Sequence, residues 1–498
     1  MPKNRPYMFY DHAVSLCAEC LRRIEANLVI QDKQVWMHKW CPEHGRTKVL
    51  IASDADYWRL GREVYVKPPE MPLKFNTEMR WGCPYDCGLC VDHMQHSCLT
   101  ILEITEQCNL RCPVCYAASG TAAQHHDLPT IEHMLDAIVA NEGQPDVVQI
   151  SGGEPTVHPQ FFAILDAAKR RPIRHLMVNT NGIRIANEPG FAERLAEYSP
   201  GFEIYLQFDS FAHSALQALR GADLRPIREK ALERLNAVGL STTLVVTIAR
   251  GINDQEIGRI VEFAAAQPCV RGVTLQPVQF AGRTEGLSHK ANRLTHTEVR
   301  QLLLEQSSLF TAADVIPVPC NPDALSMGYA IKTADGVLPL TRFVEPETLL
   351  AGQRNTIVFE SDPILKAEVF RLFATNHGPE SQASCLSALL CCLPLVQAPA
   401  EITYDRVFRV LIMAFMDADN FDIRAMKKSC VHIVQPDGRI VPFESFNLFY
   451  RGERQALLDR RRAELDALYS QSTSRASQDK VIIGLQPDHA NYIQDMTR

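Results

Sequence analysis

The cysteines of this chain are concentrated near its N-terminus, and their distribution constrains the fold more than any other feature. Ten of the 16 cysteines in 498 residues precede residue 116, and they form three groups. The chain begins Met1-Pro2-Lys3-Asn4-Arg5-Pro6 and shows no apolar core of a signal peptide, so we expect a cytoplasmic protein. In that setting clustered cysteines favour metal binding or catalysis over stable disulfides.

The third cysteine group directly follows a β-rich run at 100–105. Cys108, Cys112 and Cys115 have the spacing CxxxCxxC, and three thiolates in one loop can bind three irons of a 4Fe–4S cube. The fourth iron then has no protein ligand, and the amino and carboxylate groups of S-adenosylmethionine (SAM) can chelate it. The spacing alone leaves two alternatives, a structural zinc ion and a fully ligated electron-transfer cluster.

A glycine-rich loop follows the next β-rich run and points to the same chemistry. It reads Ser151-Gly152-Gly153-Glu154-Pro155. Glycines let the backbone approach a ligand closely, and Glu154 offers a carboxylate to a cationic amine. A plain strand-to-helix turn is the alternative interpretation.

Short β-rich runs alternate with helix-length segments after residue 100. The runs are 100–105, 147–151, 174–180, 203–209, 242–248 and 272–278, and amphipathic segments lie near 129–141, 160–170, 191–198, 226–238 and 254–266. This rhythm predicts an α/β fold with a parallel sheet and right-handed crossovers, open or curled into a partial barrel.

Two cysteine groups upstream of the barrel predict further metal sites. Cys83, Cys87, Cys90 and Cys98 could saturate an auxiliary 4Fe–4S cube, with zinc as the competing interpretation. Cys17, Cys20, Cys41 and His44 resemble the paired knuckles that bind zinc or a mononuclear iron. His38 is an alternative fourth ligand there, and a set of buried free thiols is the alternative to a metal.

Residues 100–283, with these motifs, resemble the radical SAM superfamily. The resemblance implies a (β/α)6 partial TIM barrel in which Gly152, Gly153 and Glu154 bind the SAM amino group and Tyr116 packs near the adenine. It also implies a SAM-facing position for Asn179, Thr180, Asn181, Gly182, Gln207 and Asp209, and a carboxylate contact for Arg220. An Asn-Gly turn and a solvated helix-end charge are the alternatives for Asn181-Gly182 and Arg220.

The order of motifs over about residues 12–451 is similar to that of a group containing the tetraether lipid synthases and the 7,8-dihydro-6-hydroxymethylpterin dimethyltransferases. The resemblance implies that a 5′-deoxyadenosyl radical from reductive SAM cleavage removes hydrogen from an unactivated carbon. C–C bond formation or methylation on a lipid or pterin-like substrate would follow. Asp417, Asp419 and Asp422 are candidates to pair with a pterin's amino-pyrimidine edge, although such a loop is commonly just solvated.

The C-terminal region departs from members of that group that carry a third cube. The corresponding stretch has the single Cys320, and Glu444 stands where a cysteine would be expected. Cys385, Cys391, Cys392 and Cys430 lack the spacing of a recognised cluster. This pattern argues against a third cube and against transfer of the lipid-joining activity.

We expect five parts in the chain. These are a zinc-ribbon or rubredoxin-like metal module at 1–66, an auxiliary 4Fe–4S segment at 67–99, the radical SAM core at 100–283, an α+β substrate or auxiliary domain at 284–470, and a tail at 471–498. In the C-terminal part we expect helices near 361–374, 406–415 and 453–468, and a hairpin at 431–442 that turns at Pro436-Asp437-Gly438.

Charge and hydropathy limit the partners. The net charge of −7 gives no broad basic field, which argues against nucleic acid as substrate. The sequence has no apolar run long enough to span a membrane, although peripheral contact stays open. We expect a small-molecule or lipid substrate and a reductant such as flavodoxin or ferredoxin. The competing functional class is an iron–sulfur electron-transfer or maturation protein that does not cleave SAM.

Overall fold

The computed structural model describes residues 5–121, 124–333, 336–342, 406–452 and 454–478. The segment with the expected helix at 361–374 and with Cys385, Cys391 and Cys392 lies outside these residues, as does the tail beyond residue 478. Among the described helices, none is both long and apolar enough to cross a membrane.

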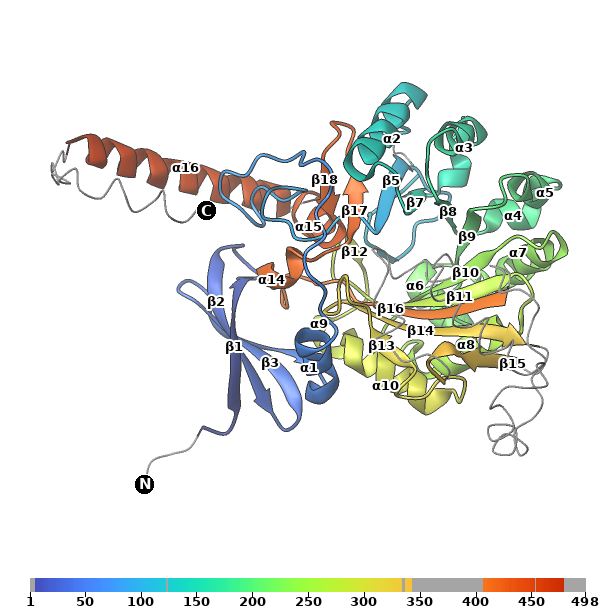
Figure 1. The fold of residues 1–498 in the computed structure, drawn as a ribbon, viewed down its shortest axis with the longest axis horizontal. Coiled ribbons are helices and arrows are strands. Elements are labelled where there is room, and N and C mark those ends of the chain that lie inside the picture. The colour runs from blue at the N-terminus through green and yellow to red at the C-terminus, as the bar shows by residue number, and fades with distance from the viewer. Residues whose placement is uncertain (1–4, 122–123, 334–335, 343–405, 453, 479–498) are drawn as a thin grey trace, which may run out of the picture.

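A small antiparallel sheet forms the N-terminal module (Figure 1). Its strands β1 (Met8–Leu16), β2 (Arg23–Gln31), β3 (Gln34–Cys41) and β4 (Gly45–Ala52) pair in chain order, and helix α1 (Ala55–Glu63) follows. Asp54 caps α1 by accepting a hydrogen bond from the Tyr57 N–H. Inward residues such as Leu28, Val35 and Met37 form a separate small core with Trp58.

Six parallel strands form the centre of the large sheet, as the βα rhythm predicts. They are β5 (Leu99–Thr105), β7 (Val147–Gly152), β8 (His175–Thr180), β9 (Phe202–Gln207), β10 (Thr242–Ile248) and β11 (Val270–Pro277). Helices α2 (Leu128–Glu142), α3 (Phe161–Lys169), α4 (Ile183–Asn187), α5 (Phe191–Ala196), α6 (His213–Arg220), α7 (Arg225–Ala237) and α8 (Ile257–Ala266) connect them, with short turns η1 (Pro155–Val157) and η2 (Asp254–Glu256).

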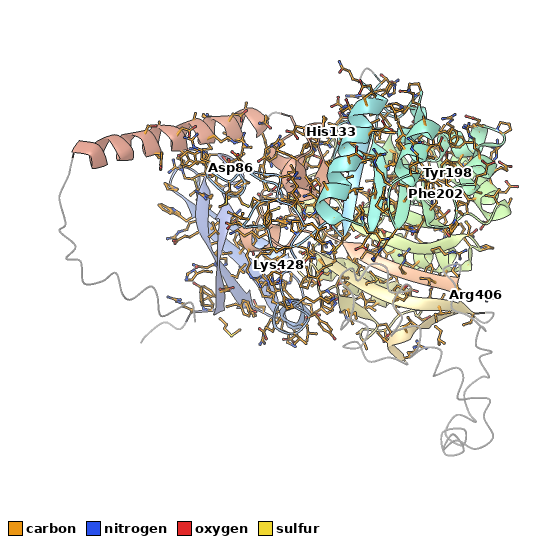
Figure 2. All side chains as sticks on the ribbon, turned by 45° about the horizontal axis from the view of Figure 1, so that its top comes forward. Asp86, His133, Tyr198, Phe202, Arg406 and Lys428 are labelled. Carbon is orange, nitrogen blue, oxygen red and sulfur yellow. The ribbon has the colours of Figure 1, made fainter. Side chains whose placement is uncertain are left out.

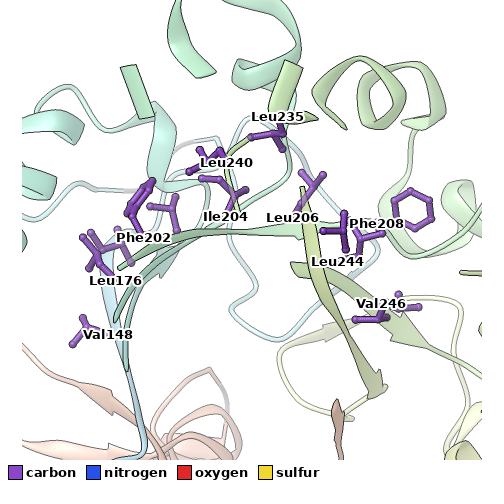
Figure 3. Packing of buried hydrophobic residues seen from close by; sticks show 14 of the residues in the cluster. Val148, Leu176, Phe202, Ile204, Leu206, Phe208, Leu235, Leu240, Leu244 and Val246 are labelled. Atoms are coloured by element: carbon purple, nitrogen blue, oxygen red, sulfur yellow. The ribbon is translucent and has the colours of Figure 1, made fainter. Parts of the chain in front are cut away.

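The main apolar core lies between these strands and their helices. Figure 3 shows Ile204 and Leu206 of β9 below Leu235 of α7 and Leu240, with Leu176 beside Phe202 and Leu244 beside Phe208. The strands read as continuous β-branched and aliphatic runs because both faces of a parallel sheet are covered.

Strands from the C-terminal region extend the same sheet at both edges. β16 (Val407–Met413) pairs in parallel with β11, and β17 (Val431–Val434) pairs in parallel with β5. Beyond β16 lie β14 (Leu325–Thr333), β13 (Val315–Pro317) and β15 (Gly336–Pro339), and beyond β17 lies β18 (Ile440–Pro442). The sheet therefore contains strands from both sides of residue 283, where we expect the boundary between the radical SAM core and the C-terminal domain.

The remaining C-terminal elements cover this sheet and reach the N-terminal module. They are α9 (His289–Asn292), α10 (His296–Gln306), η3 (Leu340–Arg342), α14 (Ile423–Met426), α15 (Phe443–Phe449) and α16 (Arg454–Gln478). The helix expected at 406–415 is wrong, because that run is strand β16. The hairpin at 431–442 is confirmed, with Gly438 at a φ of 80° in its turn.

The N-terminal sheet is fixed to the C-terminal loop that precedes α14. Lys39 Nζ donates to the backbone oxygens of Leu16 and Asp419, at 2.9 and 2.6 Å, and Ser15 Oγ donates to Phe421 O. Lys428, just after α14, lies in the junction between this sheet and the barrel (Figure 2). α16 projects beyond this junction as a long single helix (Figure 1).

Candidate active site

The loop with Cys108, Cys112 and Cys115 follows β5 and lines a cavity of about 1030 Å³, open solvent included. Within the loop, β6 (Val114–Cys115) pairs with β12 (Arg283–Thr284). The Arg283 guanidinium donates to the backbone oxygens of Cys112 and Ser119, at 2.6 and 3.0 Å. Sequence reasoning missed Arg283, because a lone arginine far along the chain gives no signal of such a contact.

The two glycines after β7 accommodate the backbone of the cysteine loop itself. A Cβ on Gly152, whose φ is 121°, would lie 2.2 Å from Thr105 O, and one on Gly153 would lie 2.1 Å from Gln107 O. Both residues line the cavity. Their backbone is thus pressed against the loop that carries the three thiols, which brings the two predicted motifs together.

Glu154 lies in the same cavity lining with almost no exposed surface. Its carboxylate accepts hydrogen bonds from Thr156 Oγ1 at 2.5 Å, Thr180 Oγ1 at 2.7 Å and Asn181 N at 2.7 Å. Burial raises the pKa of this carboxyl despite these donors. The hydrogen bonds hold the side chain in one position, facing the cysteine loop.

The other predicted polar residues take part in two sets of hydrogen bonds along the strand ends. Gln207 Nε2 donates to Asn179 Oδ1 at 2.8 Å, and Asn179 Nδ2 donates to Ser151 Oγ at 3.1 Å. Asn181 Nδ2 donates to Asn109 Oδ1 at 2.7 Å, which ties it to the cysteine loop. Asn179, Asn181, Gln207 and Tyr116 all line the cavity.

Arg220 lines the cavity, but Asp209 does not; the Asp209 side chain is fully buried behind it. The Asp209 carboxylate accepts from Arg220 Nε at 2.8 Å and Nη2 at 2.5 Å, and from Arg228 Nη2 at 2.8 Å. Asp209 therefore orients Arg220 and does not itself face the open end of the barrel. The expectation that Asp209 points into the site is corrected in this respect.

Cys83, Cys87 and Cys90 lie in one loop and all three are buried, and Cys83 and Cys87 pack in one apolar cluster with residues of α15 and α16. Cys87 N donates to Tyr450 Oη at 2.8 Å, and Asp86 accepts from the backbone N–H groups of Arg80 and Gly82 at 2.8 and 3.0 Å. These hydrogen bonds fix the backbone of the loop, two within the loop and one to Tyr450.

Cys98 lies elsewhere than predicted. Its thiol groups with those of Cys320 and Cys430, all within 4.8 Å of one another and all buried. The reason is topological, because Cys98 and Cys430 directly precede Leu99 and Val431, which face each other where β5 pairs with β17. The three thiols, brought together from three separate segments, form a candidate third metal site that the spacing of the cysteines in the sequence did not predict.

Glu444 and His96 border this three-cysteine group. Glu444 is buried, and its carboxylate accepts from Ser429 Oγ, next to Cys430, at 2.9 Å. His96 Nε2 lies 3.8 Å from Cys98 Sγ. Three thiols with a carboxylate or imidazole at hand are a donor set that fits iron or zinc.

The N-terminal group consists of Cys17, Cys20, Cys41 and His44, as predicted, within 4.8 Å of one another. Cys20 Sγ and Cys41 Sγ are 3.8 Å apart, and His44 Nδ1 lies 3.5 Å from Cys17 Sγ. A tetrahedral ion with bonds of about 2.3 Å holds its ligand atoms about 3.8 Å apart. The spacing fits one mononuclear ion, and His38 stands outside the group.

Fold and cavity together define a radical SAM enzyme. The model of the radical SAM superfamily matches residues 102–264. A second model, described as the HMPTM N-terminal zinc ribbon domain, matches residues 9–53 and thus the N-terminal metal module. The class implies a 4Fe–4S cluster and SAM as cofactors, and the cysteine loop and cavity fit both.

The chain is 31% identical over 480 residues to 7,8-dihydro-6-hydroxymethylpterin dimethyltransferase of Methanocaldococcus jannaschii, which covers 88% of this chain and 94% of that protein. It therefore belongs to this family within the radical SAM superfamily. A GTP 3′,8-cyclase of Alkaliphilus oremlandii is 30% identical over 36% of this chain and 57% of that protein. The solved structure of Streptococcus suis SuiB bound to precursor peptide SuiA has a TM-score of 0.37 at 14% identity, covering 59% of this chain and 68% of that one.

Proposed function

We propose that this enzyme reductively cleaves SAM and methylates carbon atoms of a pterin or a closely related heterocycle, with the methyl group supplied by a separate methyl donor such as a second SAM molecule, because the cleaved SAM keeps its methyl group on methionine. The observation that carries the proposal is the ligand set of the main cavity. Among the described residues that line it, Cys108, Cys112 and Cys115 are the only cysteines, and there is no histidine. The fourth iron of a cube held there would be free for SAM, which disfavours a fully ligated electron-transfer cluster.

Cys108, Cys112 and Cys115 would hold a 4Fe–4S cluster, which would supply the electron for reductive cleavage of SAM. The protein residues position the reactants. Gly152, Gly153 and Glu154 would take the SAM amino group, and Arg220 its carboxylate. Tyr116, packed 5.0 Å from Phe443, would form an apolar wall near the adenine and exclude water from the reacting carbon.

The pterin assignment rests on the relationship to the pterin dimethyltransferase over nearly its whole length. In the cytoplasm, a reductant such as flavodoxin or ferredoxin would deliver the electron that the cluster needs for SAM cleavage. Joining of lipid tails is the second candidate reaction, but no described feature favours an alkyl channel over a polar pocket.

The test is an anaerobic assay of the reconstituted protein with SAM, a reductant and 6-hydroxymethyl-7,8-dihydropterin. We expect 5′-deoxyadenosine and a pterin product that is heavier by methyl groups. Deoxyadenosine without any methylated pterin would contradict the substrate assignment. Absence of deoxyadenosine from a protein with a full complement of iron would contradict the reaction class.

A further inference from the structure

A second cavity adjoins the main one. It has about 990 Å³ of space, open solvent included, and lies between α1 of the N-terminal module, the barrel and the loop after β16. The two cavities share Pro277, Val278 and Phe415 in their linings. The Phe415 ring lies 4.1 Å from that of Phe443, which contacts Tyr116 of the cysteine loop. A molecule in the second cavity would thus lie beside the SAM site.

Four lining residues of this second cavity carry a buried polar atom that has no hydrogen-bond partner among the residues that the structure describes. The atoms are Arg62 Nη1, His296 Nε2, Asn321 Oδ1 and Asp323 Oδ2. The Arg62 and Asp323 side chains are only 6% and 8% exposed, and Asp323 Oδ2 has just a 3.5 Å ion-pair contact with Arg424. Unpaired buried polar atoms are rare, so three in one lining, beside an acceptor with only a 3.5 Å contact, indicate a ligand that supplies the partners.

The acidic loop after β16 contributes less to this cavity than its sequence indicates. Asp417 accepts from the backbone N–H of Asp419 at 3.0 Å and pairs with Arg293. Asp422 accepts from Arg424 N and from Arg62, and Asp419 pairs with His289 outside the lining. The acceptors left for a ligand are therefore Asn321 Oδ1, which has no partner among the described residues, and Asp323 Oδ2, which has only its 3.5 Å contact with Arg424.

We propose that the second cavity binds the heterocycle to be methylated, by the edge of a 2-amino-4-oxopyrimidine ring. This inference rests on the proposed function. The edge carries two adjacent donors, the amino group and a ring N–H, which match the acceptors on Asn321 and Asp323. Its carbonyl oxygen matches the free donor on Arg62. Phe415 and Trp58 supply apolar surface for the flat ring.

The N-terminal module has a role in this arrangement. Arg62 of α1 forms ion pairs with Asp323 at 2.7 Å and with Asp422 at 3.2 Å. Tyr57 Oη lies 2.6 Å from Ser326 Oγ, and Ser53 N donates to Thr297 Oγ1 at 2.7 Å. The module therefore forms one wall of the cavity, and its metal would stabilise that wall.

The experiment is an anaerobic binding titration of the full-length, reconstituted protein without reductant. The probes are 6-hydroxymethyl-7,8-dihydropterin and its 2,4-dioxo analogue, in which a carbonyl replaces the amino group. We expect the wild-type protein to bind the amino compound at least about tenfold more tightly, because the analogue leaves buried acceptors unpaired. Asn321→Ala and, separately, Asp323→Asn should reduce this preference. Asp419→Asn, in the acidic loop but outside the lining, should retain it.

Equal affinity of the wild-type protein for both probes would overturn the inference, as would an unchanged preference in both Asn321→Ala and Asp323→Asn. Iron content and the unfolding midpoint of each variant, measured alongside, identify any that fail to fold. The results distinguish a failure of this inference from a failure of the proposed function. If the protein binds the amino probe selectively but forms no methylated product, only the proposed methylation is contradicted. If it methylates the pterin but both variants keep the wild-type preference for the amino probe, only the assignment of the second cavity as the binding site is contradicted.

Discussion

The sulfur of Cys320 lies 3.7 Å from the sulfur of Cys430, although 110 residues separate them in the chain. The pairing of β17 with β5 places Cys98 in the same group. The group is buried under Glu444, which also lines the second cavity. A metal centre held here would thus lie beside the proposed acceptor site.

This grouping predicts that Cys98→Ala and Cys320→Ala remove the same bound metal. The two single variants and the double variant should therefore show equal losses after anaerobic reconstitution, because each thiol is a ligand of one centre. Metal and sulfide analysis provides the measurement. Cys269→Ala, at a buried cysteine outside every group, is the matched control and should lose nothing. An additive loss in the double variant would assign Cys98 to the Cys83 group instead.

We predict that substitution of Asp209 lowers both the stability of the protein and its affinity for SAM. Burial alone would raise the pKa of Asp209, but the charges of Arg220 and Arg228 hold it below its usual range. Asp209→Asn leaves two buried guanidinium groups poorly paired, so we expect a loss of about 3–5 kcal/mol in the free energy of unfolding. SAM affinity should fall as well, because Arg220 loses its orientation.

Urea unfolding and SAM titration check this prediction. Asp223→Asn, which removes an exposed ion pair with Arg225, is the control and should change both quantities little. If Asp209→Asn behaves like this control, Asp209 does not position Arg220.

We predict that the contacts of Arg283 with the cysteine loop help the protein to retain the radical SAM cluster. Arg283→Ala removes charged hydrogen bonds to the cysteine loop, each contributing about 2 kcal/mol. We expect faster loss of iron to a chelator and a lower rate of deoxyadenosine formation. Arg111→Ala, an arginine of the same loop that pairs with Glu285 at the surface, provides the comparison. Equal rates of iron loss in the two variants would contradict the role of Arg283.

We predict that the contribution of Glu203 to the free energy of unfolding depends on pH. Burial alone would raise its pKa, but the hydrogen bond from His175 and the charge of Arg409 hold the pKa at about 2. Because an unfolded glutamate titrates near 4.3, the contribution of about 3 kcal/mol is complete above that pH and is lost as the pH falls toward 2. Urea unfolding of the wild-type protein and Glu203→Gln should show a difference that shrinks below about pH 5. A difference that stays constant down to pH 3 would contradict this assignment.

The parts of the fold that follow a local pattern could be predicted from the sequence. The run Thr242–Ile248 coincides with β10. A β-branched stretch between two helical segments predicts a strand of a parallel sheet. The cysteine loop, the glycine-rich loop and the four ligands of the N-terminal module are likewise local motifs. Strands β5 and β7 bring the first two of these together.

Features that depend on long-range pairing could not be predicted. The run Val407–Met413 is apolar almost throughout, so its periodicity does not distinguish a buried strand from a buried helix. It forms a strand because it pairs with β11 and β14, which the sequence does not show. Cys98 stands eight residues after Cys90, and that proximity suggested one cluster, whereas β17 places Cys430 beside it. Arg283 and Asn321 act through contacts between distant segments that no spacing reveals.

The central claim is that a cluster on Cys108, Cys112 and Cys115 cleaves SAM. The most direct measurement is 5′-deoxyadenosine formation by the anaerobically reconstituted enzyme with SAM and reductant, compared between Cys112→Ala and Cys269→Ala. Both variants lose one buried cysteine, but only the first loses a predicted iron ligand. The account predicts deoxyadenosine from the wild-type protein and Cys269→Ala, and none from Cys112→Ala. Equal deoxyadenosine formation by Cys112→Ala, or none from a fully reconstituted wild-type protein, would contradict it.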